Sequence, residues 1–235
     1  MDDIAAGIVD KFSVIDFFNV LISGVVFIYG LSLTLNDYIP AYLYNNITLA
    51  GGIEKGIITF ILCYLSGGVI QMVKILFFDI YRSMVTSKCL AKIDTKKHWI
   101  KINCVLDNNY KRDVYIKLAV RLFHNKQLGS FNPSDTKMCQ YFFAYCEYYN
   151  TLRGNNAKTE KMREVSSLCE QIAIAFYSLT IIAFFYFVIN KSGYYWLFFF
   201  ILGTVFAERA RISRINWAKM VMATYEAGVD RENNK

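Results

Sequence analysis

The chain of 235 residues is 55% hydrophobic and 17% aromatic, and it contains only 2 prolines. This composition excludes a disordered protein and is too apolar for a soluble protein of this length, so we expect an integral membrane protein. The 26 Lys and Arg outnumber the 19 Asp and Glu, which gives a net charge of +7. The positions of these charges predict how the chain is oriented in the membrane.

Four apolar stretches predict an all-α polytopic protein with four transmembrane helices. They form two hairpins, 1–78 and 168–207, on either side of a polar insert, and the stretches are 17–35, 56–78, 172–189 and 194–207. About 19 helical residues come close to the roughly 30 Å thickness of the hydrocarbon core. The fourth stretch reaches only about 21 Å as a helix, so we expect it to tilt or to thin the bilayer.

The first apolar stretch is preceded by a pattern typical of a helix start. Ser13 and Asp16 have the spacing of a capping box, which predicts a helix that begins near Val14. The segment before it opens with Met1, Asp2 and Asp3 and has no basic region, so we expect this helix to stay in the mature protein rather than to act as a cleaved signal peptide.

The basic residues are distributed unevenly around these stretches. Residues 36–54 contain no Lys or Arg and residues 190–193 contain one, whereas residues 79–167 contain sixteen and residues 208–235 contain six. The positive-inside rule therefore places both termini and the insert in the cytoplasm, which for a bacterial protein means the inner membrane. With eight Asp and Glu, the insert has a net charge of +8.

The insert, residues 79–167, is expected to be a basic helical domain, with residues 98–106 left as an uncertain extended segment. A helix over 109–126 has an amphipathic pattern whose apolar face is Tyr115, Leu118, Ala119 and Leu122. A second helix is expected to start after Pro133, with Ser134 as its cap, and to run to about Tyr149.

Two helices show apolar residues at coiled-coil spacing. In the second helix of the insert these are Cys139, Phe142, Cys146 and Tyr149, and further aromatic residues widen the stripe until it nearly encircles the helix, namely Tyr141, Phe143, Tyr145 and Tyr148. In the C-terminal helix, 208–235, they are Ile215, Ala218, Met222 and Tyr225. These faces are expected to be buried.

Polar and small residues share one face on each of the first two transmembrane helices. Asn19 and Ser23 lie on the first helix, and Gly67, Gln71 and Lys74 lie on the second. Such faces hold membrane helices together, because lipid cannot satisfy polar groups, and the same residues would also suit a water-lined path. Both interpretations stay open, and the packing interpretation is favoured.

Two ionisable residues lie nearest the bilayer, each about one turn from the cytoplasmic end of its helix. They are Lys74 in the second span and Glu170 at the start of the third. Lys74 either extends to the interface or forms an ion pair with Glu170. Charge reversal at one position, rescued by reversal at the other, would support the pair.

A basic surface is expected on the insert, formed by Lys111, Arg112, Lys117, Arg121 and Lys126. A surface of this kind is usually only solvated, and the alternatives are an anionic ligand, lipid head groups or an acidic partner. Nucleic acid is disfavoured because the nearby aromatic residues have core spacing. His98 and His124 lack the spacing of metal ligands, and no nucleophile or phosphate-binding motif occurs, so we expect no metal, no cofactor and no enzymatic activity.

The segment Asp16-Phe17-Phe18-Asn19-Val20-Leu21-Ile22-Ser23-Gly24-Val25-Val26-Phe27 is followed by a second span, a basic helical insert and a closing hairpin that ends in Glu208-Arg209-Ala210-Arg211. This layout resembles small four-pass membrane proteins of bacterial antiphage defence loci, such as the Kiwa-type membrane subunits. The resemblance implies an inner-membrane sensor or effector that self-associates and works with a soluble cytoplasmic protein, and it assigns a role to no single residue.

The first functional hypothesis is therefore a homo-oligomeric defence protein that senses or perturbs the membrane by shifting between two packings of its helices. The second hypothesis is a passive anchor that recruits a soluble enzyme and carries no ion flux. A lipid-modifying enzyme would need a catalytic cluster at the interface, and the sequence offers none.

Overall fold

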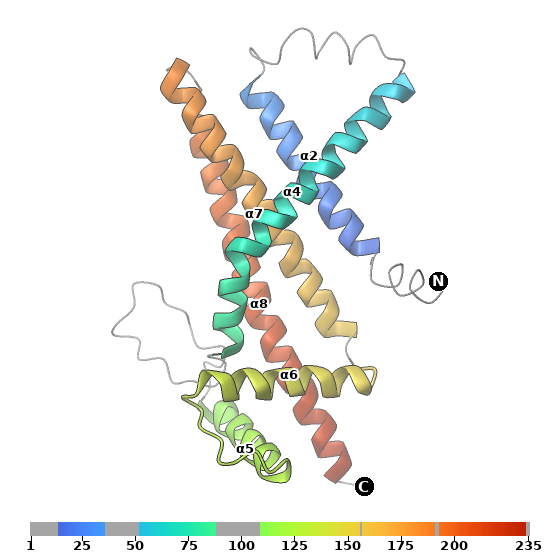
Figure 1. The fold of residues 1–235 in the computed structure, drawn as a ribbon, viewed down its shortest axis with the longest axis vertical. Coiled ribbons are helices and arrows are strands. Elements are labelled where there is room, and N and C mark those ends of the chain that lie inside the picture. Colours follow the sequence, from blue (N-terminus) through green and yellow to red (C-terminus); the bar gives the residue numbers. More distant parts are fainter. Residues whose placement is uncertain (1–13, 36–51, 88–108, 156, 191–192, 234–235) are drawn as a thin grey trace. The chain divides into compact units, whose positions relative to one another are not determined.

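The computed structural model describes residues 14–35, 52–87, 109–155, 157–190 and 193–233 (Figure 1). Within these ranges all regular secondary structure is helical, which confirms the all-α prediction. The helices are α2 (Val14–Thr34), α4 (Gly52–Ser87), α5 (Asn109–Asn125), α6 (Thr136–Leu152), α7 (Ala157–Asn190) and α8 (Tyr195–Asn233). The predicted start near Val14 is confirmed, whereas Ser13 and the uncertain segment 98–106 lie outside the described residues.

The chain divides into two compact units. The first unit comprises Met1–Phe78 and Glu164–Ala210, and the second comprises Asp79–Arg163 and Arg211–Lys235. Helices α4, α7 and α8 each contribute to both units, because the divisions fall within these three uninterrupted helices.

Helix α2 of the first unit turns its polar face inward and its apolar face outward. Its exposed large residues recur at helical spacing and are Phe18, Ile22, Val25, Tyr29 and Leu33. The opposite face buries Asn19, Ser23 and Thr34, each less than 5% exposed. In water this arrangement would expose a continuous apolar stripe, whereas in lipid it places apolar side chains against the acyl chains.

Helices α2 and α4 cross at two glycines with backbone against backbone (Figure 1). A Cβ atom on Gly24 would overlap the carbonyl oxygen of Cys63, and a Cβ atom on Gly67 would overlap the carbonyl oxygen of Val20. Small residues allow this close approach, which is a common device in membrane helix packing. The crossing therefore depends on the absence of a side chain at both positions.

Apolar clusters also hold the first unit together. Leu179, Ala183 and Phe199 join α7 to α8, and Phe27 of α2 packs against them. Ile70 of α4 packs against α7 in a second small cluster. These contacts place four helical segments in one bundle.

The second unit has a larger core, built mainly from aromatic residues of α5, α6 and α8. Its edge-to-face contacts include those between Phe143 and Trp217, between Phe142 and Tyr225, and between Phe123 and Phe131. The apolar faces predicted for all three helices lie in this core, either buried or partly buried. The coiled-coil spacing thus identified the faces that pack.

Two details of α6 correct the sequence-based expectations. The N-cap is Asp135 rather than Ser134, because the Asp135 side chain accepts from the backbone N–H groups of Lys137 and Met138 at 2.8 and 3.4 Å. The aromatic stripe does not encircle the helix, since Tyr141 and Tyr148 are 45% and 61% exposed.

Three helices are long and apolar enough to cross a membrane, over Asp16–Thr34, Gly52–Leu76 and Ala157–Asn190. This finding supports a helical membrane protein and covers the first three predicted spans. Over the described residues, α8 does not have an apolar segment long enough to be included with these three helices. Charged residues follow its short apolar segment, with Glu208 and Arg209 directly after Ala207.

Candidate functional site

The polar residues predicted on the first two membrane helices lie mostly inside the helix packing. Asn19 is 4% exposed and Ser23 is fully buried, and the Ser23 hydroxyl donates to the carbonyl oxygen of Val20 at 2.9 Å. Gly67 lies at the crossing with α2, while Gln71 is half-buried. The Asn19 side-chain nitrogen is buried and has no hydrogen-bond partner within the described residues.

A buried polar cluster occurs on α7, about one turn before the apolar part of this helix. The Ser166 hydroxyl lies 3.3 Å from Oε1 of Glu170 and 3.2 Å from the carbonyl oxygen of Ala210 in α8, and it is placed to donate to either. Glu170 is only 2% exposed and Ser166 only 1%. A polar group that is buried this deeply needs hydrogen-bond partners in place of water, and the Ser166 hydroxyl is one partner of Glu170.

Helix α4 contributes a cation to this region. Lys74 Nζ donates to the Ser167 hydroxyl at 2.7 Å, so α4 and α7 are joined by a hydrogen bond to a charged group, which is stronger than one between neutral groups. The structure thus brings Lys74 to the turn of α7 that carries Glu170. The ion pair between Lys74 and Glu170 stays a prediction.

Sequence reasoning missed the serines and one amide of this cluster. Ser166 precedes Glu170 by four residues, a spacing that places both on one helix face, and this was the available signal. Gln171 is 2% exposed, and its side-chain oxygen has no hydrogen-bond partner in the described part of the chain. The name "polar cluster" is used below for Lys74, Ser166, Ser167, Glu170 and Gln171.

The basic surface predicted on the insert is partly visible. Lys117 and Arg121 are exposed on α5, and Lys126, just after the helix, lies 5.9 Å from the centre of the Tyr145 ring in a cation–π contact. Lys111 and Arg112 belong to α5, but their side chains lie outside the described residues.

No group of three or more His, Cys, Asp or Glu within the described ranges is placed to hold a metal ion. Neither a family model, nor a curated protein, nor a solved structure matches the chain. The arrangement of polar groups at helix contacts is therefore the main guide to function.

Proposed function

We propose that this chain is a four-pass protein of the bacterial inner membrane that acts as a homo-oligomer in antiphage defence. In this proposal the membrane helices sense or perturb the bilayer, and the second unit passes their state to a soluble cytoplasmic protein. The resemblance to small defence proteins supports the cellular role. The observation that carries the coupling is the continuity of α7 and α8, each of which contributes residues to both units.

A fourth crossing by the start of α8 is part of the proposal. Several large residues of this segment are exposed, namely Leu197, Phe198, Phe200, Ile201 and Val205. Such a surface suits lipid better than water. An apolar segment of about 21 Å is short for the hydrocarbon core, and local thinning of the bilayer or an arginine side chain that reaches the interface would compensate.

The polar cluster is the proposed switching element. Its hydrogen bonds join α7 to α4 through Lys74 and to α8 through Ser166. In this proposal a small rotation of the helices lets these polar groups exchange hydrogen-bond partners, which gives two packings of similar free energy. A ligand or protein partner that binds one packing more tightly then shifts the population toward it. Water entering between these helices would line a conducting path with the same groups.

The test is ion flux through the full-length protein in liposomes, measured with the wild type and with Ser166→Ala. The substitution removes the hydroxyl that faces Glu170 and α8, so we expect flux to change by about tenfold, the effect of about 1.4 kcal/mol on the balance between packings. Ser178→Ala on the same helix is the matched control and should behave as the wild type. If the wild type conducts ions and Ser166→Ala conducts them equally, the polar cluster is not the switching element.

A second variant tests the residues of α4 that were predicted to line a water-filled path. Replacing Gln71 and Lys74 together by leucine should abolish conductance while expression is retained, because both side chains lie at the α4 face that would be wetted. Unchanged conductance would exclude these two residues from the path.

The second candidate is a passive anchor that recruits a soluble enzyme through the exposed basic residues of the second unit, such as Lys117 and Arg121. Removing the partner separates the two functions. A pore permeabilises the membrane when it is overexpressed without its partner, whereas an anchor leaves the membrane potential unchanged in every variant.

A further inference from the structure

A small cavity that is partly open to solvent lies in the second unit, where α6, α7 and α8 meet. Its volume is about 40 Å³, and its walls include Glu147, Asn150, Thr159, Glu160, Arg163 and Trp217. A volume of roughly 15 Å³ is enough for one water molecule, so the cavity has room for a small ion with some of its hydration. The walls are rich in side-chain oxygen atoms and carry no histidine or cysteine.

Asn150 lines the cavity and carries an amide oxygen that no described residue satisfies. Its side-chain nitrogen donates to the carbonyl oxygen of Val221 at 2.8 Å, which fixes the orientation of the amide. The amide oxygen is buried and has no hydrogen-bond partner among the described residues, although Asn150 is only 2% exposed. A buried acceptor of this kind calls for a donor or a cation from outside the chain.

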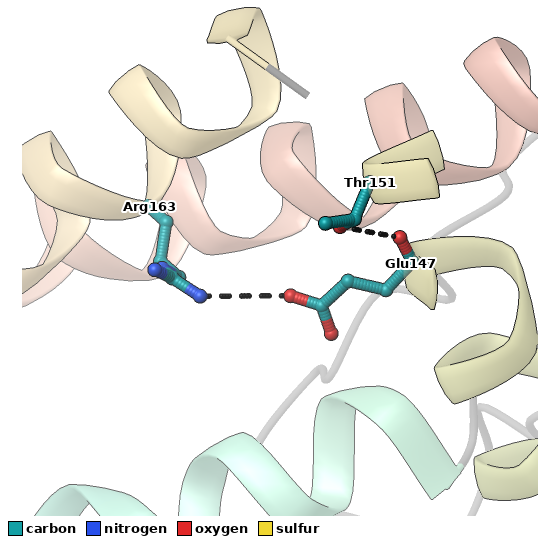
Figure 2. A network of polar contacts seen from close by, with 3 residues as sticks. All are labelled: Glu147, Thr151 and Arg163. Carbon is teal, nitrogen blue, oxygen red and sulfur yellow. Dashed lines mark hydrogen bonds and ion pairs between the residues drawn. The ribbon is translucent and has the colours of Figure 1, made fainter. Parts of the chain in front are cut away.

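Two glutamates line the same cavity as Asn150. Glu147 lies one turn before Asn150 on α6, and Glu160 lies on α7. Arg163 Nη1 approaches Glu147 Oε1 at 3.6 Å, and both side chains are well exposed, at 49% and 37% (Figure 2). An ion pair of this length and exposure is weak, so Glu147 is free to exchange Arg163 for another cation.

We propose that this cavity binds a hydrated divalent cation of the Mg²⁺ type, through the amide oxygen of Asn150 and the carboxylates of Glu147 and Glu160. All three donors are oxygen atoms, which hard cations prefer, and Mg²⁺ commonly takes one or two carboxylates and keeps several water molecules. The two carboxylates and Arg163 leave a net charge of −1 at the walls, which favours a cation over an anion. The site shares no residue with the polar cluster, so a test of cation binding is independent of the proposed function.

The experiment is a titration of the full-length protein in detergent with Mn²⁺, followed by electron paramagnetic resonance, and with Mg²⁺ by displacement of Mn²⁺. We expect saturable binding of one ion per chain. Glu147→Gln and Glu160→Gln should each weaken binding by about tenfold or more, since ligand charge sets affinity in such sites. Arg163→Gln should tighten it by about tenfold, because it removes the competing cation.

Asp230→Asn is the matched control, since this exposed carboxylate of α8 does not line the cavity, and it should bind Mn²⁺ as the wild type does. Glu160 is exposed, so its substitution leaves the core intact and tests the site even if Glu147→Gln fails to fold. The absence of saturable binding in the wild type would overturn the proposal and leave the cavity to water. Binding that neither glutamate variant weakens would overturn it as well.

Discussion

Replacing Gly67 by alanine is expected to force α2 and α4 apart, whereas the same replacement at the neighbouring Gly68 should be tolerated. The added methyl group on Gly67 would overlap the carbonyl oxygen of Val20 and lie 2.8 Å from its carbonyl carbon. A methyl group on Gly68 would meet nothing within 4 Å. The two variants therefore make the same chemical change, one residue apart, in opposite surroundings.

The magnitude follows from the distances. Ordinary contact of a Cβ atom begins at about 3.4 Å, and the atoms in the way are backbone, which cannot change rotamer. The helices must separate by roughly 0.5 Å or more, and overpacking of this kind costs about 1–3 kcal/mol. Alanine is the better helix former by up to about 1 kcal/mol, so Gly68→Ala should be neutral or slightly stabilising.

The assay is thermal unfolding of the purified protein in one detergent, followed by the loss of the monodisperse size-exclusion peak. For a chain of this size about 1 kcal/mol corresponds to roughly 2–4 °C, so Gly67→Ala should lower the Tm by several degrees relative to Gly68→Ala. Gly24→Ala should behave like Gly67→Ala, because its methyl group would lie 2.6 Å from the carbonyl carbon of Cys63. Equal Tm values for Gly67→Ala and Gly68→Ala would refute the crossing.

Two further predictions concern the second unit. Asp135→Ala should lower stability by about 1 kcal/mol through loss of the α6 cap, while Ser134→Ala should have little effect, and unfolding of both variants checks the assignment. Burial and the nearby Glu226 raise the pKa of Tyr115 above its ordinary value, so the stability that the neutral phenol contributes is present below about pH 10 and is lost as the pH rises further. Tyr115→Phe should therefore give a flatter Tm profile above about pH 10, and an unchanged slope in that window would argue against a buried neutral Tyr115.

Much of the helical architecture was predictable because it depends on local periodicity. The start of α2 follows from the spacing of two capping residues, and the packed faces of α5, α6 and α8 follow from the spacing of apolar residues. The structure confirms the start and the faces. The cap of α6 was misplaced by one residue, since Ser134 and Asp135 are both good capping residues and only the geometry distinguishes them. The exposed rings on α6 show that spacing alone does not tell how wide a buried stripe is.

The candidate sites were harder to predict, because each depends on a partner from a distant part of the chain. Lys74 and Ser167 are 93 residues apart, and Asn150 and Val221 are 71 apart. No periodic pattern links such positions. The sequence did identify Lys74 and Glu170 as unusual, since charges near a membrane span are rare, but it did not indicate which hydroxyl groups would meet them.

The two units are held together by different kinds of contact, and this difference affects how a movement of the membrane helices would be transmitted. The second unit is held by interlocking aromatic side chains, such as Phe142, Trp217 and Tyr225, and a dense core of this kind resists sliding. The first unit is held by glycine contacts, two small apolar clusters and a few hydrogen bonds, because lipid offers its helices no hydrophobic drive to associate. A change in the membrane is therefore expected to move helices within the first unit more readily than within the second. Since α7 and α8 are uninterrupted between the units, such a movement would reach the second unit as a displacement of whole helices rather than as a rearrangement of its core.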